Sequence, residues 1–357
     1  KRPQDRVAVK PHAAPVIYSL MHQLGVLSES DMKRLREIGG PQPYPTKLKN
    51  PDFVDYTTSS EALGVCATIY DAYGAIHHNR AFAQPGGPRN VDSVYWAHCG
   101  DGELTEGQID ESLYDAGRWR LNNLVWIVDL NRQSLDRVMD DSGRLEEWVR
   151  AKFRGQGWNT IALAWGCRAE ALFEREGGEA LKALLERLPD SMFHPFLMLD
   201  GAAKRQVLLG GVEHEAPEQS HALRWFQARL QVGEEERRGV AKAINALNDA
   251  DLQGGLTHLG GHDMGALIRA YQEAIMSAEG PAVVIAHTIK GYETSAAGHP
   301  ENHGMLLPSD EVALWGQARG VDASQPYPKP EAESDAGRRC VELGRLYLEE
   351  PADPYAQ

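Results

Sequence analysis

An acidic stretch with two glycines, CGDGELTEG (residues 99–107), is the first part of the sequence whose residue types could do chemistry. It follows an apolar run and precedes a helical pattern, a junction at which glycine loops commonly hold phosphate groups. Phosphate loops normally bring a lysine, whereas this stretch brings Asp101, Glu103 and Glu106. Mg²⁺ resolves the conflict, because it takes oxygen ligands from one or two carboxylates together with substrate phosphates. The stretch therefore predicts a diphosphate held through a magnesium ion.

A second oxygen donor, Asn131, follows the apolar run NLVWIVDL, thirty residues after Asp101. Ligands of an open parallel sheet bind beyond the carboxyl ends of its strands, so we expect Asp101 and Asn131 to meet there. Gly100 and Gly102 would let backbone N–H groups approach the phosphate, and the next helix would offer its N-terminus. Either motif alone is more often a turn or a loop cap. Together, in strand–loop–helix order, they predict one metal–diphosphate site.

Strands that alternate with helices must position these residues. Strand-like apolar runs are expected at residues 91–99, 123–131, 158–166 and 282–291. Helical patterns are expected as a hairpin over 12–38, in which Ser28 and Asp31 form a capping box, and over 62–78, 107–120 and 145–157. The alternation predicts an α/β fold: a doubly wound, mainly parallel sheet with helical elaboration.

The expected organisation is one cofactor-binding domain followed by a short tail. Residues 1–320 form the domain, and its charged, helical part, at about 168–255, is expected to be an insertion that elaborates the sheet. From residue 321 the chain becomes rich in proline and glutamate and then resumes a helical pattern. Residues 321–357 are therefore expected to be a linker and a short C-terminal helix.

Composition argues against several classes of function. The formal net charge of −14, without a basic run, disfavours nucleic-acid and anionic-membrane partners. Apolar stretches fall short of the ~20 residues that span a bilayer. The cysteines, Cys66, Cys99, Cys167 and Cys340, are scattered and form no CxxC pair, so we expect a reduced, cytoplasmic protein. Cys99 is expected to be a small buried side chain, not a nucleophile.

GDGELTEG, with the Asn of DLNRQSLDR about thirty residues later, resembles the thiamine diphosphate motif. The family is the thiamine diphosphate-dependent enzymes, with the homodimeric type of pyruvate dehydrogenase E1 component nearest and transketolase more distant. Counterparts of VKPHAAP, YPTKLKNPDFVDYTTSSEALG, GWNTIALAWG, LGGHD and AHTIKGYETSAAGHPENHG occur there in the same order, so the resemblance covers nearly the whole chain. It implies the diphosphate-binding half of such an enzyme, with thiamine diphosphate and Mg²⁺ as cofactors.

The resemblance also implies a role for each matching position. Asp101 and Asn131 would be side-chain ligands of Mg²⁺, and Gln133 would offer its backbone carbonyl. The residues implied to bind the cofactor are Gly100, Asp101, Gly102, Glu103, Asn131 and Ser60.

Three further residues are implied to be catalytic. His12, in KPHAAP, matches a histidine near cofactor and substrate, and Tyr44, in PQPYP, matches a tyrosine of the substrate pocket. His303, in GHPENHG, matches a loop histidine that closes over the active centre and assists acyl transfer. The alternative for each is an ordinary solvated loop side chain.

Two positions depart from the family pattern. Ala62 stands where the family tends to place a glycine, beside Glu61, and Ala14 stands where a serine is common. A carboxylate at position 61 could alter the choice of substrate.

The sequence contains no counterpart of the pyrimidine-binding domain, which carries the glutamate that activates the cofactor. We therefore expect a companion chain with that domain and a site shared between the chains. The assembly implied is of the (αβ)₂ type. The first hypothesis is decarboxylation of a 2-oxo acid of the pyruvate type, with transfer of the two-carbon unit to a lipoyl or other acyl-carrier domain. A transketolase-like ketose cleavage and a non-catalytic cofactor-binding half remain open.

Overall fold

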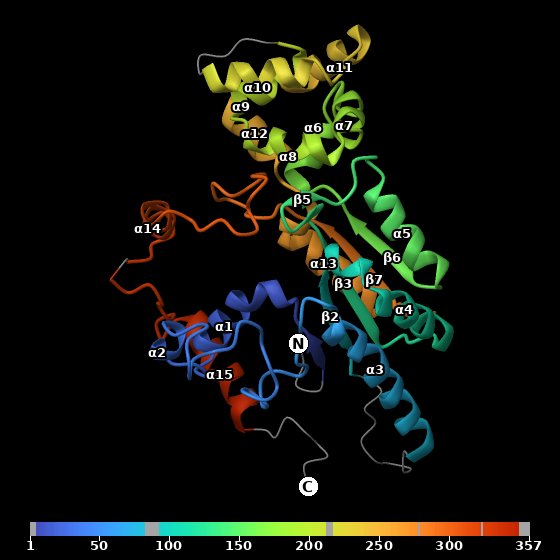
Figure 1. Cartoon of the computed structure of the whole chain (residues 1–357), viewed down its shortest axis with the longest axis vertical. Helices are drawn as coiled ribbons and strands as arrows, with labels where there is room; N and C mark the ends of the chain where they lie inside the picture. The colour runs from blue at the N-terminus through green and yellow to red at the C-terminus, as the bar shows by residue number, and fades with distance from the viewer. Residues whose placement is uncertain (1–4, 83–92, 212–216, 278, 323, 350–357) are drawn as a thin grey trace.

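A five-stranded parallel sheet forms the centre of the computed structural model, which describes residues 5–82, 93–211, 217–277, 279–322 and 324–349 (Figure 1). The strands are β1 (Arg6–Ala8), β2 (Tyr95–Gly100), β3 (Leu124–Leu130), β6 (Asn159–Leu163) and β7 (Ala282–His287). Their order is β1-β2-β3-β7-β6. Strand β3 is central and nearly all buried, which explains why its sequence is a continuous apolar run. The expected α/β class, a mainly parallel sheet, is confirmed.

The strand register brings the carboxyl ends of β2, β3 and β7 to one edge of the sheet. Gly100 pairs with Asp129, and Leu130 pairs with His287. The loops that leave these three strands therefore start beside one another, as the sequence predicts for Asp101 and Asn131.

Helices cover both faces of the sheet. One face packs against α3 (Leu63–Phe82), α4 (Gly107–Trp119) and α5 (Leu145–Gly155), with Ile69, Leu113 and Phe153 in the same core as Trp126. The other face packs against α13 (Met264–Ile275), whose Ala270 and Ala274 join the core that contains Ile127 and Val284. Amphipathic spacing gives α4, α5 and α13 a buried side on the sheet.

A helical region lies beyond the sheet, at the top of Figure 1. Its helices are α6 (Cys167–Phe173), α7 (Gly178–Glu186), α8 (Asp190–Met198), α9 (Gly201–Leu209), α10 (Pro217–Gln227), α11 (Glu234–Ile244) and α12 (Asp249–Leu256). They enclose a hydrophobic core of their own, centred on residues such as Leu184, Phe196 and Phe226. Helix α8 of this region contacts Arg132 in the loop that follows β3.

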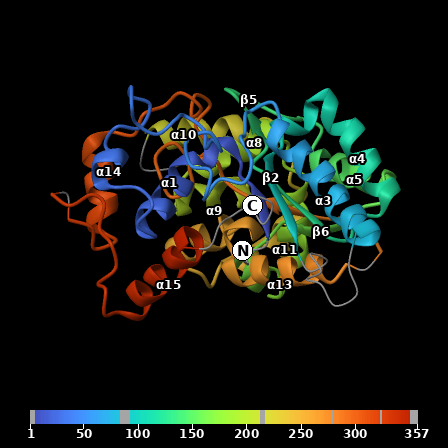
Figure 2. The ribbon, with the colours of Figure 1, turned by 90° about the horizontal axis from the view of Figure 1, so that it is seen from below.

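The segments between β1 and α3 and after β7 lie together on one side of the molecule, away from α3, α4 and α5 (Figures 1 and 2). They contain η1 (Pro11–Ala13), α1 (Ala14–Gln23), α2 (Glu29–Met32), α14 (Ser309–Gln317) and α15 (Asp335–Glu349). The Gln23 side chain donates to the carbonyl oxygen of Pro328 at 2.8 Å, and Gly344 of α15 lies against the backbone of Leu24. The C-terminal segment thus packs on α1.

Several elements differ from the sequence-based expectation. The capping box of Ser28 and Asp31 is confirmed, but the helix it starts, α2, ends at Met32, short of residue 38. Arg36 adopts a left-handed φ of 68°, which a continuous helix does not allow. Strand β1 was not expected, because three residues are too few to show alternation. Strand β2 begins at Tyr95, and residues 91 and 92 of its expected range lie outside the described residues.

Candidate active site

Asp101 lies immediately beyond β2 and is almost fully buried. Its Oδ1 accepts the N–H of Gly102 at 2.9 Å, so it caps η3 (Gly102–Thr105). Its Oδ2 accepts the N–H of Arg132, beyond β3, at 2.6 Å. The carboxylate therefore joins the two loops whose meeting the sequence predicted.

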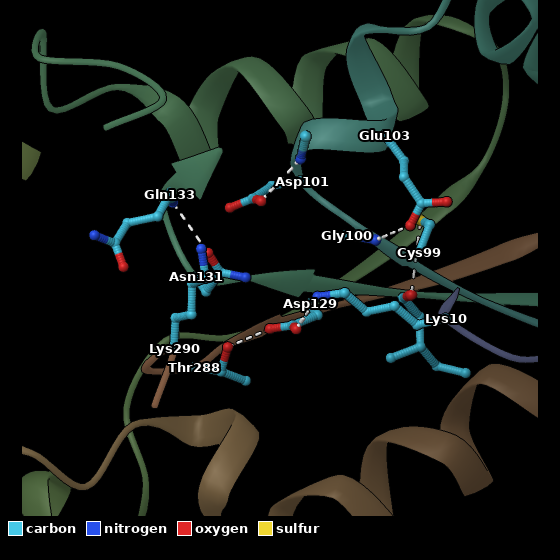
Figure 3. Close-up of polar contacts among 12 residues, drawn as sticks. Lys10, Cys99, Gly100, Asp101, Glu103, Asp129, Asn131, Gln133, Thr288 and Lys290 are labelled. Carbon is cyan, nitrogen blue, oxygen red and sulfur yellow. Dashed lines mark hydrogen bonds and ion pairs between the residues drawn. The ribbon is translucent and has the colours of Figure 1, made fainter. Parts of the chain in front are cut away.

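Asn131 and Gln133 are the buried residues on the opposing loop. The Asn131 Oδ1 accepts the N–H of Gln133 at 3.0 Å, which closes a tight turn before the short hairpin of β4 (Gln133–Ser134) and β5 (Arg137–Val138). Figure 3 shows the Asp101 carboxylate facing this turn. Asn302, from the loop after β7, donates to the Gln133 Oε1 at 2.7 Å. Three loops thus surround one group of oxygen donors.

Arg132, between these two residues, was missed by the sequence reasoning. It adopts a left-handed φ of 65°. Its guanidinium lies 3.5 Å from the Asp190 carboxylate of α8, 3.1 Å from the His287 Nδ1, and 4.5 Å from the centre of the Phe193 ring. These contacts fix the backbone N–H that Asp101 accepts.

Glu103 is buried on the other side of the glycine loop (Figure 3). Its Oε2 accepts the N–H of Gly100 at 2.8 Å. A Cβ atom at Gly100 would lie 3.2 Å from the Lys10 Nζ, and one at Gly102 would lie 3.1 Å from the Ser134 Oγ. The two glycines therefore keep the loop backbone open beside charged and polar groups.

Lys10 supplies the cation that the loop itself lacks. Its Nζ forms an ion pair with Asp129, the last-but-one residue of β3, and the Thr288 hydroxyl donates to the other oxygen of that carboxylate. The sequence reasoning named His12 in the segment KPHAAP but not Lys10. Pairing of Ala8 with Ala97 places Lys10 level with the end of β2, so the parallel register is the signal that could have found it.

His12, Tyr44 and His303 come together from three distant segments. The His12 ring meets that of Tyr44 edge-on, with 5.9 Å between centres, and that of His303 with 6.0 Å. The Lys290 Nζ lies 3.4 Å from the His303 Nδ1 and donates to the Leu135 carbonyl oxygen at 3.1 Å. Lys290, also missed, thus connects this group of rings to the hairpin loop beside the oxygen donors.

Part of this chain matches a known family model. Residues 3–174 match the family model described as the thiamine diphosphate binding domain of transketolase. The matched range ends just after α6 and covers the glycine loop, Asn131 and the opening segment that carries Lys10 and His12.

Relatives named pyruvate dehydrogenase E1 component match most of the chain. That of Corynebacterium glutamicum is 28% identical over 325 residues, which is 89% of this chain and 32% of the relative. That of Escherichia coli K12 is 26% identical over 301 residues, 84% of this chain and 30% of the relative. The chain therefore spans about a third of the length of these curated relatives.

Solved transketolases share the fold. The structure of transketolase from Leishmania mexicana superposes with a TM-score of 0.59 at 19% identity, covering 98% of this chain and 39% of that one. The enzyme from Campylobacter jejuni gives a TM-score of 0.53 at 18% identity, with 99% and 42% covered. At these identities the likeness shows the fold alone.

Ser60 lies apart from the oxygen donors of the domain. Its hydroxyl lies 3.3 Å from the Glu61 carboxylate, and the Glu61 carbonyl oxygen accepts from Gln108 of α4. The segment TTSSEALG thus lies beside the glycine loop, whereas, within the described residues, the Ser60 side chain forms no hydrogen bond with Asp101 or Asn131. Ala62, which departs from the family pattern, adopts a left-handed φ of 60°, the conformation that favours glycine.

Buried acids dominate the electrostatics of the domain. Burial raises the pKa of Asp101 to about 7, helped by the negative charge of Asp129 and opposed by Lys10. Burial likewise raises the pKa of Glu103 to about 7, against backbone N–H groups and Lys10. Burial alone would lower the pKa of Lys10, but Asp129, Asp101 and Glu103 raise it overall. A divalent cation at Asp101 and Asn131 would relieve this unfavourable negative charge, so the donor set fits Mg²⁺.

Cys99 is buried within β2, as expected. Burial and the nearby Glu103 carboxylate raise the pKa of its thiol well above the ordinary value. A protonated, inaccessible thiol is a poor nucleophile, so Cys99 acts as a packing residue.

Proposed function

We propose that this chain is the diphosphate-binding part of a thiamine diphosphate-dependent enzyme that decarboxylates a 2-oxo acid of the pyruvate type and passes the two-carbon unit to a lipoyl or other acyl carrier. The observation that supports this most is that the loops of Asp101 and Asn131 adjoin the rings of His12 and His303, with Lys290 bridging His303 to the hairpin loop after Asn131. Relatives named pyruvate dehydrogenase E1 component align with most of the chain around it.

Three residues are proposed to hold Mg²⁺: Asp101 and Asn131 through their side chains and Gln133 through its backbone carbonyl. Gly102 and Glu103 are proposed to line the diphosphate, and Gly100 and Ser60 are proposed to bind the cofactor as well. When bound, thiamine diphosphate supplies the carbanion chemistry that breaks the bond next to the substrate carbonyl. The chain contributes placement: buried oxygen donors fix the cation, and open glycine backbone lets the phosphates approach.

The ring cluster is proposed to act on the substrate. Partial desolvation, together with Lys10, His303 and Lys290, lowers the pKa of His12, so its imidazole is neutral at pH 7 and able to accept a proton. Lys290 contacts His303 and offers a positive charge to an anionic substrate group. Tyr44, packed on His12, would position the substrate between them.

A companion polypeptide or domain is proposed to complete the site. It would carry the pyrimidine-binding domain and its activating glutamate, in an (αβ)₂ assembly located in the cytoplasm. The support is the share of the relatives that this chain covers, about a third of their length. The boundaries proposed for the chain itself are a domain over 1–320, with a helical insertion near 168–255, and a tail from 321.

Calorimetric titration of the full chain with thiamine diphosphate and Mg²⁺ tests the cofactor site. Asp101→Ala should abolish Mg²⁺-dependent binding, whereas Glu106→Ala should leave it unchanged. Glu106 is a matched control, because it lies in the same loop and caps α4 without a side-chain hydrogen bond. Unchanged affinity in Asp101→Ala, with a native circular dichroism spectrum in both variants, would refute the proposed metal ligand.

Turnover by the assembly purified through this chain separates the three functions. Consumption of pyruvate with acylation of a carrier supports the proposal, and consumption of xylulose 5-phosphate with an aldose acceptor supports the transketolase-like alternative. An assembly that binds cofactor and consumes neither donor would support the non-catalytic alternative. The assay should also include 2-oxo acids other than pyruvate, because the Glu61 carboxylate beside the glycine loop could change which donor is accepted.

A further inference from the structure

Cys167, His258 and Asp263 bring three metal-ligating side chains together outside the cofactor site. Cys167 is the first residue of α6, His258 lies in the loop after α12, and Asp263 caps α13. One ligand atom from each lies within 4.8 Å of the other two. Cys167 is exposed, His258 is half-buried and Asp263 is buried, so the group is open to solvent on one side.

Backbone contacts hold the three segments together without a ligand. Trp165 and Leu259 form an isolated antiparallel bridge, and the N–H of Gly166 donates to the His258 carbonyl oxygen at 2.8 Å. A Cβ atom at Gly166 would lie 2.3 Å from the His258 Nδ1. Only a glycine therefore lets the imidazole approach the start of α6, and the site is preorganised by the chain.

The donor atoms can turn toward a common centre. The Asp263 Oδ2 accepts the N–H of Cys167 at 2.7 Å, and its Oδ1 accepts the N–H of Ala266 at 2.9 Å. Each oxygen keeps a second lone pair. The His258 Nδ1 accepts the N–H of Arg168 at 3.4 Å, long for such a bond, which shows its lone pair directed at the start of α6.

We propose that Cys167, His258 and Asp263 bind a divalent cation of the zinc class, with a fourth position left to water or an external ligand. Thiolate, imidazole and carboxylate are the ligands that Zn²⁺ takes, whereas Mg²⁺ and Ca²⁺ take oxygen alone. The site therefore differs in chemistry from the oxygen donors around Asp101. Three protein ligands with an open position are typical of a reactive or exchangeable zinc site.

Occupation of this site would couple the helical region to the cofactor domain. The cation would join the starts of α6 and α13, and His262, next to Asp263, accepts the N–H of Ile289 at 2.9 Å. The His262 ring also stacks on Tyr292 with 3.7 Å between centres. Ile289 lies between Thr288 and Lys290 in the sequence. The hydrogen bond from Ile289 to His262 therefore connects the segment of Asp263 to residues near the proposed cofactor site.

Proton release is expected on binding. A ligating cysteine is a thiolate, so cation affinity should increase with pH as the thiol proton is lost.

Titration of the full chain with Co²⁺, in the presence of excess Mg²⁺, tests the proposal. The expected result is one equivalent bound with a sulfur-to-cobalt charge-transfer absorption, which oxygen donors alone do not give, and displacement by Zn²⁺. Cys167→Ser should remove the absorption, and His258→Gln should weaken binding at least ~10-fold, since even outer-sphere losses cost that much. Cys340→Ser is the matched control, because Cys340 is a partly accessible free cysteine elsewhere.

The outcomes are decisive in either direction. No charge-transfer absorption in the wild-type chain, or its survival in Cys167→Ser, overturns the proposal. Loss in Cys340→Ser as well would assign the signal to another cysteine and also overturn it. Circular dichroism shows whether each variant is folded, and His258→Gln preserves the helix starts if Cys167→Ser does not fold.

Discussion

Replacing Arg132 tests whether its buried side chain positions the metal loop. Its guanidinium contacts Asp190 and Phe193 of α8, and its backbone N–H holds Asp101 at 2.6 Å. Arg132→Met removes the ion pair while keeping much of the side-chain volume. We expect the affinity for thiamine diphosphate with Mg²⁺ to fall about 10- to 100-fold, the loss typical of residues that orient metal ligands, which is ~1.4–2.8 kcal/mol.

The same substitution should also destabilise the fold, which a second variant separates from positioning. Asp190 is 2% exposed, and Arg132→Met leaves its carboxylate without the guanidinium, at a cost of about 3–5 kcal/mol in the free energy of unfolding. Burial already raises the pKa of Asp190 to about 6, against the lowering effect of Arg132. Arg132→Met/Asp190→Asn removes that charge and should recover most of the stability while the affinity stays low.

Calorimetry and urea unfolding of the single and double variants provide the measurement. Arg150→Met is the matched control: Arg150 pairs with Glu146 on α5 at 2.7 Å and contacts no proposed metal ligand in the described structure. It should keep the wild-type affinity. Recovery of affinity in the double variant would refute the reasoning, because the loss would then come from instability and not from the position of the Asp101–Arg132 contact.

Three other substitutions have expected outcomes. His303→Ala should leave cofactor binding unchanged but slow carrier acylation about 10²-fold in single-turnover assays of the assembly, since general acid–base groups typically contribute that much; equal rates would remove His303 from the mechanism. Ala62→Gly should stabilise the chain by about 0.5–1 kcal/mol in urea unfolding, because relief of left-handed strain exceeds the entropy that glycine adds; a destabilised variant would contradict the strain. Lys204 is fully buried, and burial lowers its pKa from 10.5 to about 7. Between these two pH values the unfolded chain binds one more proton than the folded chain. The free energy of unfolding of the wild-type chain should therefore rise by up to about 1.4 kcal/mol per pH unit. Lys204→Met should lose that slope, and a slope that persists would assign it to other groups.

The central part of the site was predictable because it depends on local sequence and one topological rule. Asp101 and Asn131 each follow a recognisable buried strand, and parallel strands end at the same edge of the sheet. The parallel register of β2 and β3 then brings Asp101 and Asn131 together, and no information about distant segments is needed. The same logic explains why the α/β class followed from alternating apolar runs and amphipathic helices.

The other site residues, and the length of α2, depend on long-range contacts that a local sequence pattern does not predict. Lys10 reaches Asp129 across 119 positions in the sequence, because the three-residue strand β1 joins the sheet edge. Arg132 looks like a solvated loop residue until α8 supplies Asp190 and Phe193. The length of α2 was wrong for a related reason: a left-handed Arg36, followed by packing against other loops, ended a pattern that propensity alone would continue.

Half of the described non-glycine residues with a positive φ lie in segments that form the candidate site. Ala62, Arg132 and Leu135 all have positive φ values, of 60°, 65° and 54°, although none is glycine. Each such residue costs about 1–2 kcal/mol. Each also belongs to a segment that holds a site group: the segment of Ala62 lies beside Glu103, Arg132 donates to Asp101, and Leu135 accepts from Lys290.

These conformations persist only because packed neighbours determine them. The helical region supplies the neighbours of Arg132, and α4 supplies Gln108 beside the segment of Ala62. A chain without α8 would therefore also lose the contacts that hold Arg132 in its left-handed conformation. The turn from Asn131 to Gln133 would relax toward ordinary φ values, the N–H of Arg132 would leave Asp101, and the buried carboxylate would have to accept a proton or solvent in its place.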